Sequence, residues 1–415
     1  MTNSLPSLRL AHTDDDLAAV FRLRYEVYIE GMGLQIEHAD HQRRWIKEEH
    51  DDHSWIVLAE DAGRCVGTSR MSFAADVDFD EAKRRYFGFD HFAGLVPDRQ
   101  LSTINRLVVA PEYRGSGLAL QLFAASYATA ARRGVELILG ACELPLINYY
   151  RKLGFRPFGA LANLPGNGIR ARIAVVAGLI DETLDPLIAA ALNQRKQPSE
   201  MVSALLERLD EEPALVSERR VGVDSLLNKI RRQLDGKALD GKALDGKVLD
   251  VEAPQIFAGL DAEQIRRLLR GSHLVTARPG NQLYARGHLS RALYMLIAGD
   301  IEIHRHGEDQ RRNSWTIRRQ GALIGEASKG HCSRRRNDAV VGPRGATLLA
   351  LDNRVVDQLL AGNDALAKIF QGYFASELGD PQRETKRSVA RRRNVPGAAL
   401  VRQSRRARQA AILSR

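Results

Sequence analysis

The stretch "VVAPEYRGSGLALQLF", residues 108–123, passes from an apolar strand-like segment through a turn rich in Arg and Gly into a helical segment. In such an arrangement the first amides of the helix face an anion, and the glycines let that anion approach closely. A P-loop is excluded because no Lys-Ser/Thr pair follows the glycines, and a dinucleotide fingerprint is excluded because Leu120 stands at its third Gly. The turn therefore predicts another kind of phosphate site, and a turn that merely connects strand and helix is the alternative.

A second motif, "INYYRKLGFRPFG" at residues 147–159, reads as a short helix that runs into a strand. Together, "YRGSGLA" and "NYYRKLGF" resemble the GNAT acyltransferase superfamily, whose two patterns are Arg/Gln-x-x-Gly-x-Gly/Ala and Tyr-x-x-x-Gly-Phe. The resemblance implies that the turn holds the phosphates of acyl-coenzyme A or of the acyl-pantetheine arm of an acyl carrier protein. The residues that it assigns to this phosphate site are Arg114, Gly115, Ser116, Gly117, Leu118 and Ala119.

The same resemblance implies a direct transfer of the acyl group to an amine. A neutral amine attacks the thioester carbonyl, the backbone amide of Val109 stabilises the oxyanion, and Tyr150 protonates the leaving thiolate. Tyr150 as a core aromatic residue is the alternative. Cys142 is interpreted as a buried thiol rather than a nucleophile, and Glu143 is a weak candidate for a base.

The N-terminal segments "FRLRYEVYIEGMG", "EEHDDHSWIVLAE" and "GTSRM" resemble the acyl-homoserine-lactone synthases and the related N-acyl amino acid synthases. That resemblance places a group of residues on the acceptor side of the site, namely Arg24, Val27, Tyr28, Asp51, Asp52, Arg70 and Arg106. Thr103 stands where the lactone synthases carry Glu, which favours N-acylation of an amino acid or another amine over lactone formation from S-adenosylmethionine. A structural ion pair between Arg24 and Asp51 is the alternative reading of those two residues.

The C-terminal half, from "IFAGLDAEQIRRLLRGSHLV" onward, resembles a cyclic-nucleotide-binding domain. The resemblance implies that Gly325 and Glu326 meet the ribose and that Arg336 pairs with the cyclic phosphate of cAMP or cGMP as an effector. The pattern departs from the family just after this Arg, where Asn337 and Asp338 replace Ser/Thr-Ala. A structural module without ligand is therefore the competing interpretation.

The sequence predicts a mixed α/β fold in two units. Residues 1–180 form a GNAT-like domain with a mixed central sheet, and residues 253–380 form a cyclic-nucleotide-binding-like β-roll with flanking helices. Between them lie a helical connector at 181–233, with amphipathic helices that need a partner surface, and a linker at 234–252. The linker repeats a five-residue unit, "LDGKALDGKALDGKVLD", whose period fits neither helix nor strand.

The basic character of the chain belongs to its last segment. The net charge is +10, and residues 381–415 alone carry eleven Lys and Arg against one Glu. This tail is predicted to be disordered and solvated, and it is too short and too charged for the helix-turn-helix of a transcription regulator, so nucleic acid is an unlikely partner.

The three cysteines form no metal-binding or disulfide pattern, and no signal or membrane-spanning segment is recognisable. We therefore expect a cytoplasmic N-acyltransferase without a metal, with a small-molecule amine as acceptor and acyl carrier protein as a possible partner. A non-catalytic nucleotide-sensing protein and a protein-lysine acetyltransferase are the alternatives.

Overall fold

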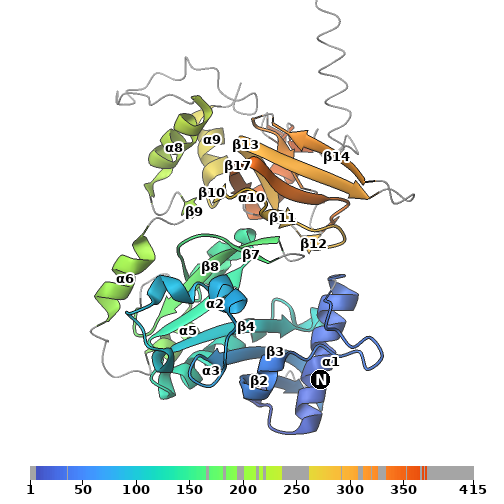
Figure 1. Cartoon of the computed structure of the whole chain (residues 1–415), viewed down its shortest axis with the longest axis vertical. Coiled ribbons are helices and arrows are strands. Elements are labelled where there is room, and N and C mark those ends of the chain that lie inside the picture. The colour runs from blue at the N-terminus through green and yellow to red at the C-terminus, as the bar shows by residue number, and fades with distance from the viewer. Residues whose placement is uncertain are drawn as a thin grey trace, which may run out of the picture.

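The structure of the chain is a computed structural model. It describes residues 6–34, 36–164, 168–180, 184–193, 201–211, 215–217, 221–235, 261–290, 292–306, 312–318, 320–325, 333–351, 353–364, 367–368 and 370–371. The tail at 381–415, most of the predicted linker and Glu326 lie outside these residues. Figure 1 shows two sheet-based units, the N-terminal one in blue and green and the C-terminal one in orange.

The N-terminal unit, which we call the transferase unit after the activity predicted for it, is built on one mixed sheet with the strand order β1-β2-β3-β4-β5-β8-β6, and with β7 paired to β8. Only the β4–β5 pair is parallel among the strand pairs described in this sheet. The predicted mixed α/β class is therefore confirmed. The strands are β1 Ser7–Leu10, β2 Trp55–Asp61, β3 Arg64–Phe73, β4 Leu101–Val109, β5 Leu137–Cys142, β6 Arg156–Pro157, β7 Ala162–Leu164 and β8 Gly168–Val176.

Helices lie against this sheet and connect its strands. The first begins with a capping box, in which the amide of Asp16 donates to Thr13 Oγ1 at 3.1 Å and the amide of Thr13 donates to the Asp16 carboxylate at 3.2 Å. The parallel pair β4–β5 requires a crossover, and α3 supplies it. The helices of this part are α1 Asp14–Tyr25, α2 Glu81–Phe87, α3 Leu118–Arg132, α4 Ile147–Arg151, α5 Pro186–Leu192 and α6 Val202–Asp210.

The C-terminal unit, which we call the roll, is an antiparallel sheet dominated by two long strands, β13 and β17. Three helices pack on it, and the apolar face of α8 buries Leu226 and Ile230 completely. The strands are β9 Leu215–Ser217, β10 His273–Ala277, β11 Gln282–Tyr284, β12 Leu289–Ser290, β13 Leu293–His306, β14 Arg312–Ile317, β15 Leu323–Ile324, β16 Ser333–Arg334 and β17 Asp338–Leu351. The helices are α8 Val223–Asp235, α9 Ala262–Leu269 and α10 Asn353–Ala361.

The segment predicted as a connector is divided between the two units. Helix α5 packs on α3, and α6 contacts the short 3-10 helix Phe89–Phe92, so both belong to the transferase unit. Strand β9 pairs with β10, and α8 packs against α9 and β13, so both belong to the roll. The partner surfaces that the amphipathic helices needed are thus the two units themselves.

The two units share a buried interface. One hydrophobic cluster runs without interruption from α3 and β5 into the strands of the roll. The amide of Gln282 donates to Asn163 Oδ1 at 3.1 Å across the boundary. Gly168 comes so close that a Cβ there would lie 2.6 Å from the carbonyl oxygen of Leu283, and its φ of +67° also favours Gly. The roll is therefore packed directly on the start of β8.

Within the described residues, no helix combines the length and the apolar character that a membrane crossing requires.

Candidate active site

The two parallel strands separate at their carboxyl ends. Strands β4 and β5 are paired at only three positions, of which Thr103↔Leu139 is the last, although β4 continues to Val109 and β5 to Cys142. Beyond that pair β4 and β5 are no longer paired with each other, and we call the region between their carboxyl ends the opening. Helix α3 follows β4 in the chain and α4 follows β5, each after a short 3-10 turn, and Phe123 of α3 packs against Tyr150 of α4, so the two predicted motifs lie beside this opening.

The amide of Val109 faces this opening. The amide of Ala110 donates to the carbonyl of Val66 on β3 at 2.9 Å, which makes Val66 and Ala110 a hydrogen-bonded pair of the antiparallel ladder. In such a ladder the next pair, Gly67 and Val109, is a non-hydrogen-bonded pair, whose backbone groups point away from each other. The Val109 amide therefore points to the side from which β5 has separated.

The predicted phosphate turn is exposed at the start of α3. Gly115 and Gly117 have φ values of +82° and +86°, in the left-handed region that Gly adopts readily, and Gly117 is the residue that begins the helix. The helix's first hydrogen bond runs from the Gln121 amide to the Gly117 carbonyl at 3.2 Å, so the amides of Ala119 and Leu120 precede its own ladder. Arg114 and Ser116 are exposed beside them, while Leu118 is buried. Exposed helix-start amides beside an arginine are the groups that the predicted phosphate site requires.

Tyr150 lies on α4 beside the end of β5. Its ring packs edge-on against Phe155 and Phe123, with centroids 5.4 Å and 5.9 Å away. Burial raises the pKa of the Tyr150 phenol well above 10, and the nearby Cys142 and Tyr28 raise it further. The hydroxyl is therefore protonated at neutral pH. Tyr149, by contrast, is 38% exposed.

Cys142 does not have the properties of a nucleophile. The side chain is 3% exposed, and burial raises the pKa of its thiol well above the usual value, so the thiol stays protonated. This agrees with its interpretation as a buried thiol.

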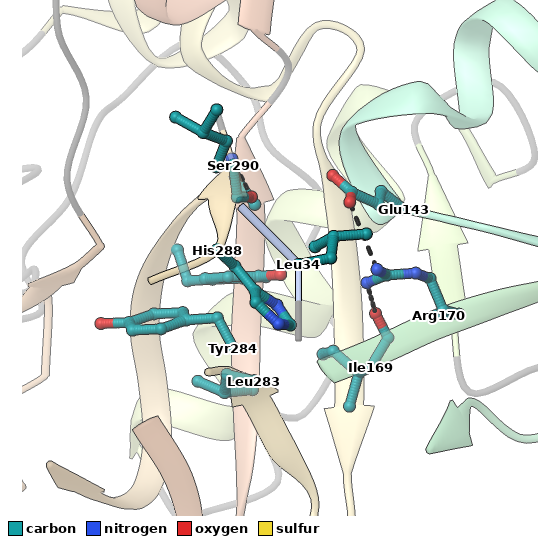
Figure 2. A pocket seen from close by; sticks show the side chains of 11 residues that line it. Leu34, Glu143, Ile169, Arg170, Leu283, Tyr284, His288 and Ser290 are labelled. Atoms are coloured by element: carbon teal, nitrogen blue, oxygen red, sulfur yellow. Dashed lines mark hydrogen bonds and ion pairs between the residues drawn. The ribbon is translucent and has the colours of Figure 1, made fainter. Parts of the chain in front are cut away.

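Glu143 is engaged in an ion pair with Arg170, at 3.3 Å. Both side chains line a small pocket between the two units, of about 360 Å³ including the space open to solvent. Figure 2 shows Glu143, Arg170 and Ile169 on the transferase side of the pocket and His288 and Leu283 on the roll side. Burial lowers the pKa of His288, so its ring is neutral at pH 7. Glu143, which directly follows β5, thus lies between the candidate site and the interface of the two units.

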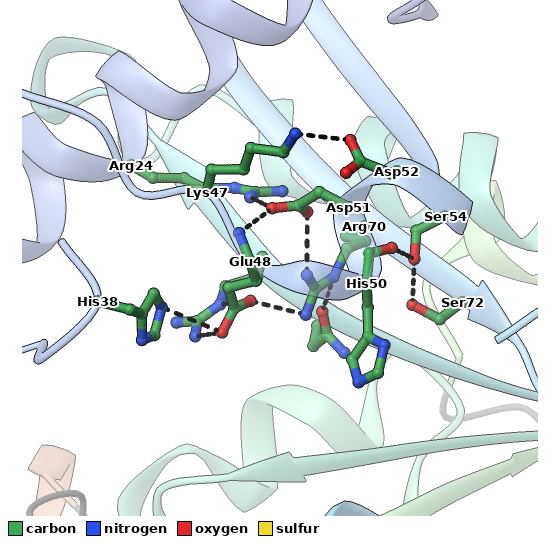
Figure 3. A network of polar contacts seen from close by, with 12 residues as sticks. Arg24, His38, Lys47, Glu48, His50, Asp51, Asp52, Ser54, Arg70 and Ser72 are labelled. Carbon is green, nitrogen blue, oxygen red and sulfur yellow. Dashed lines mark hydrogen bonds and ion pairs between the residues drawn. The ribbon is translucent and has the colours of Figure 1, made fainter. Parts of the chain in front are cut away.

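Five of the seven predicted acceptor-side residues come together in one polar network, which Figure 3 shows in part: Arg24, Tyr28, Asp51, Arg70 and Arg106. Asp51 is its centre, because its two oxygens accept from Arg24 Nη1 at 2.8 Å and from Arg70 Nη1 at 2.9 Å. The side chains of Arg24 and Asp51 are both 0% exposed. The structural ion pair that was the alternative reading of these two residues is therefore present.

Glu48 is a member of the network that the sequence analysis missed. Its carboxylate forms an ion pair with Arg70 at 2.8 Å and accepts a bidentate hydrogen bond from Arg106. Burial alone would raise the pKa of Glu48, but the hydrogen bond and charge of Arg106, together with the charges of Arg70 and Arg24, hold it well below its usual value. Asp51 follows the same pattern with Arg24 and Arg70, so both carboxylates are ionised.

Local irregularities of the backbone bring Arg106 and Tyr28 to the network. The β3–β4 ladder shifts register between Thr68 and Arg70, and Arg106 in the shifted region has a φ of +51°. Tyr28 lies in a π-helical turn, Glu26–Gly31, that continues α1, and the guanidinium of Arg106 sits 5.5 Å from the centre of its ring. Arg106 is 25% exposed, so this end of the network reaches the surface while the Arg24 end does not.

Two further residues of the predicted acceptor side lie elsewhere. Asp52 points outward and pairs with Lys47 at 2.8 Å, with its side chain 51% exposed. Val27 is buried in the apolar cluster beneath α1. The adjacent acidic residues Asp51 and Asp52 thus have opposite environments.

The predicted nucleotide residues of the roll are described only in part, since Glu326 is outside the described residues. Arg336 is exposed, whereas its neighbour Arg335 is 2% exposed and its guanidinium lies 4.3 Å from the centre of the Tyr284 ring. A Cβ on Gly325 would lie 2.7 Å from Arg335 Nη1. The arginine on the inside of the roll, next to Gly325, is therefore Arg335.

Among the described residues, no group of three or more His, Cys, Asp and Glu side chains is arranged to hold a metal ion.

The candidate site lies in the segment of the chain that matches a protein family model. Residues 19–176 match the family model described as "N-acyl amino acid synthase FeeM". The segment includes both motifs and all of the polar network, so the transferase unit resembles that family over most of its sheet. No curated protein matches the chain.

Three solved structures illustrate the structural similarities. A coenzyme A-dependent acyl-homoserine lactone synthase, BjaI with MTA, is 21% identical, with a TM-score of 0.34 over 49% of this chain and 98% of its own. ElaA of Escherichia coli is 16% identical, with a TM-score of 0.30 over 41% and 99%. A cyclic nucleotide-binding-like protein from Brucella abortus is 21% identical, with a TM-score of 0.22 over 26% and 90%.

Proposed function

We propose that this protein is an N-acyltransferase that moves an acyl group from a thioester, on coenzyme A or acyl carrier protein, to the amine of an amino acid. One observation carries the proposal: the opening between β4 and β5 is bordered by the Val109 amide, the phosphate turn and the protonated Tyr150. These are the three groups that such a transfer needs, namely an oxyanion donor, a cradle for the donor's phosphates and an acid for the thiolate. The match of residues 19–176 to a family of N-acyl amino acid synthases supports the same reaction.

In the proposed reaction, the acceptor first loses a proton from its ammonium group to solvent. The amine nitrogen then forms a bond to the thioester carbonyl carbon, and the oxygen, now negative, accepts a hydrogen bond from the Val109 amide. When the C–S bond breaks, the electron pair stays on sulfur, and Tyr150 gives its proton to the thiolate. The nitrogen, positively charged after the attack, loses one proton to solvent, and the Tyr150 phenolate takes one proton back from solvent, so the products are an amide and a free thiol.

The test is thiol release by the purified full-length protein, with decanoyl-coenzyme A or decanoyl-acyl carrier protein as donor and each proteinogenic amino acid as acceptor. We expect release that depends on both donor and acceptor, with the amide identified by mass spectrometry. Release only in a parallel assay with acetyl-coenzyme A and a lysine-containing peptide would indicate a protein-lysine acetyltransferase instead. Release that never exceeds the rate without protein would refute the enzyme proposal.

Gly117→Ala is expected to weaken donor binding. The left-handed φ of +86° costs a non-Gly residue about 1–2 kcal/mol, and the turn relieves that strain by moving the amides that face the phosphate. We expect the KM for the acyl donor to rise about tenfold, with the KM for the acceptor unchanged. Gly94→Ala is the matched control, because Gly94 has a φ of +77° and the same open space around a Cβ. An equal KM change in both variants would contradict a phosphate role for the turn.

We propose, in addition, that the roll binds a cyclic nucleotide through Arg335 rather than Arg336. The support is the position of Arg335, which is buried on the inside of the roll against Gly325, while Arg336 faces solvent. Calorimetry with cAMP and cGMP is expected to give heat that Arg335→Ala abolishes and Arg336→Ala retains. Absence of heat at millimolar nucleotide with the unaltered protein would end the proposal of an effector.

A further inference from the structure

Helix α4, which carries Tyr150, is tied to the roll by two hydrogen bonds. Asn148 Nδ2 donates to the carbonyl oxygen of Gly271 at 2.9 Å, and Arg151 Nη2 donates to Ser217 Oγ at 3.1 Å. The two acceptors lie together at one corner of the roll, since Gly271 precedes β10 and Ser217 is paired with His273 in that strand. The residues that flank Tyr150 in sequence are thus anchored on the other unit.

The helix depends on such contacts for its orientation. It has five residues, far fewer than the roughly 12–15 that an isolated helix needs, and its first turn has no side-chain cap. Its direction is therefore set by the surfaces on either side of it.

Two adjacent faces of α4 meet two different units. Ile147 and Tyr150, three residues apart, face the transferase core, where Tyr150 packs on Phe123 and Phe155. Asn148 and Arg151, also three apart, lie on the next face and contact the roll. A rotation of the helix about its axis would break the bonds to the roll and move the phenol at the same time.

We infer that the roll positions Tyr150 for acyl transfer, through the hydrogen bonds that Asn148 and Arg151 make to Gly271 and Ser217. The inference rests on the proposed function and adds a structural role for the roll that needs no nucleotide. Asn148 and Arg151 are positioning residues, because they act on the reaction only through the helix. The expected signature is a change in turnover rather than in substrate binding.

The test is a double-mutant cycle on the full-length protein with Arg151→Ala, Ser217→Ala and the pair together, measured by thiol release. Each single change is expected to lower kcat about five- to tenfold, since small displacements of a catalytic group are costly, and to leave both KM values within about twofold. The double variant should be no worse than either single one, because the two changes remove the same contact. Arg151→Lys keeps a donor and is expected to recover part of the loss.

Arg208→Ala is the matched control. Arg208 donates to the carbonyl oxygen of His91 at 3.2 Å in a partly buried contact between α6 and the Phe89–Phe92 helix, away from α4. Removing it deletes a contact of the same kind, and kcat is expected to stay unchanged.

A second readout does not depend on activity. Amide hydrogen exchange of the peptide 144–155 is expected to be faster in Arg151→Ala and in Ser217→Ala than in the unaltered protein. If the unaltered protein is active and Arg151→Ala and Ser217→Ala both keep its kcat, the inference is wrong and the proposed function stands. The same holds if the double variant loses kcat by the product of the two single losses. An inactive unaltered protein would refute the proposed function, and unchanged exchange in the peptide would then overturn the inference as well.

Discussion

Tyr150→Phe is expected to lower kcat about 100-fold, the lower end of what a positioned general acid contributes. The change removes only the hydroxyl, and the ring can keep its contacts with Phe123 and Phe155, so the fold and the KM for the donor should be preserved. The measurement is steady-state thiol release over a range of donor and acceptor concentrations.

Tyr149→Phe is the control, because that ring is next in the sequence, lies 5.9 Å from Tyr150 and is 38% exposed. It should retain full activity. If Tyr150→Phe keeps kcat within twofold, the thiolate leaves without help from this residue, and the acid role is wrong.

The pH dependence of kcat offers an independent check. Burial, with Cys142, Tyr28, Tyr149 and Glu143 nearby, places the pKa of Tyr150 above its ordinary value of 10. An acid with a raised pKa stays protonated up to that pKa, so titration of Tyr150 should cause no loss of kcat between pH 7 and about 10. A loss in that range that is absent from Tyr150→Phe would show that the phenol ionises earlier than its environment implies.

Asp51→Asn is expected to lower the free energy of unfolding by about 3–5 kcal/mol, the usual cost of breaking a buried ion pair on one side. Asp51 pairs with both Arg24 and Arg70, and since Arg70 keeps its ion pair with Glu48, the substitution leaves the buried charge of Arg24 without its ion-pair partner. Urea unfolding followed by circular dichroism measures the difference.

Asp52→Asn is the matched control on the adjacent residue. Its pair with Lys47 is about half exposed, and such pairs contribute at most about 1 kcal/mol. Equal losses in the two variants would mean that Asp51 is not a buried partner of the two arginines.

The ion pairs of Glu48 and Asp51 also predict how acid changes the stability of the protein. The pKa values of Glu48 and Asp51 are lowered in the folded protein, so their contribution to stability is complete above the unfolded values near 4. It is lost progressively as the pH falls from there toward the folded values. In Asp51→Asn, the part of this acid sensitivity that belongs to Asp51 should be absent.

The resemblance to the acyl-homoserine-lactone and N-acyl amino acid synthases selected five residues that the structure brings together. Arg24, Tyr28, Asp51, Arg70 and Arg106 are distant in sequence, yet the structure brings them into one network. Glu48 was missed, although a signal was present. Three arginines against one aspartate leave an excess of charge that a buried cluster must balance, and Glu48 stands three residues before Asp51.

Two further features of the structure could not be predicted from the local sequence. The segment "STINRLVV" reads as a regular strand, so the shift in register and the positive φ of Arg106 come from tertiary contacts. Which of Arg335 and Arg336 faces inward depends on the end of a two-residue strand, β16, where a shift of one residue exchanges the two sides.

Strand β9 is the hardest case, because three residues carry no pattern, and their partner β10 begins more than fifty positions later. Because of this pairing, the boundary between the two units in space does not coincide with the repeat linker in the sequence. Leu215–Ser217 and α8 precede the repeat linker in sequence but belong to the roll in space. A gene fragment that starts after the linker would therefore encode a roll without its edge strand and one covering helix. A chimaera that takes its C-terminal unit from a related protein would therefore need its fusion point before residue 215. A fusion point in the repeat linker would separate β9 and α8 from the roll.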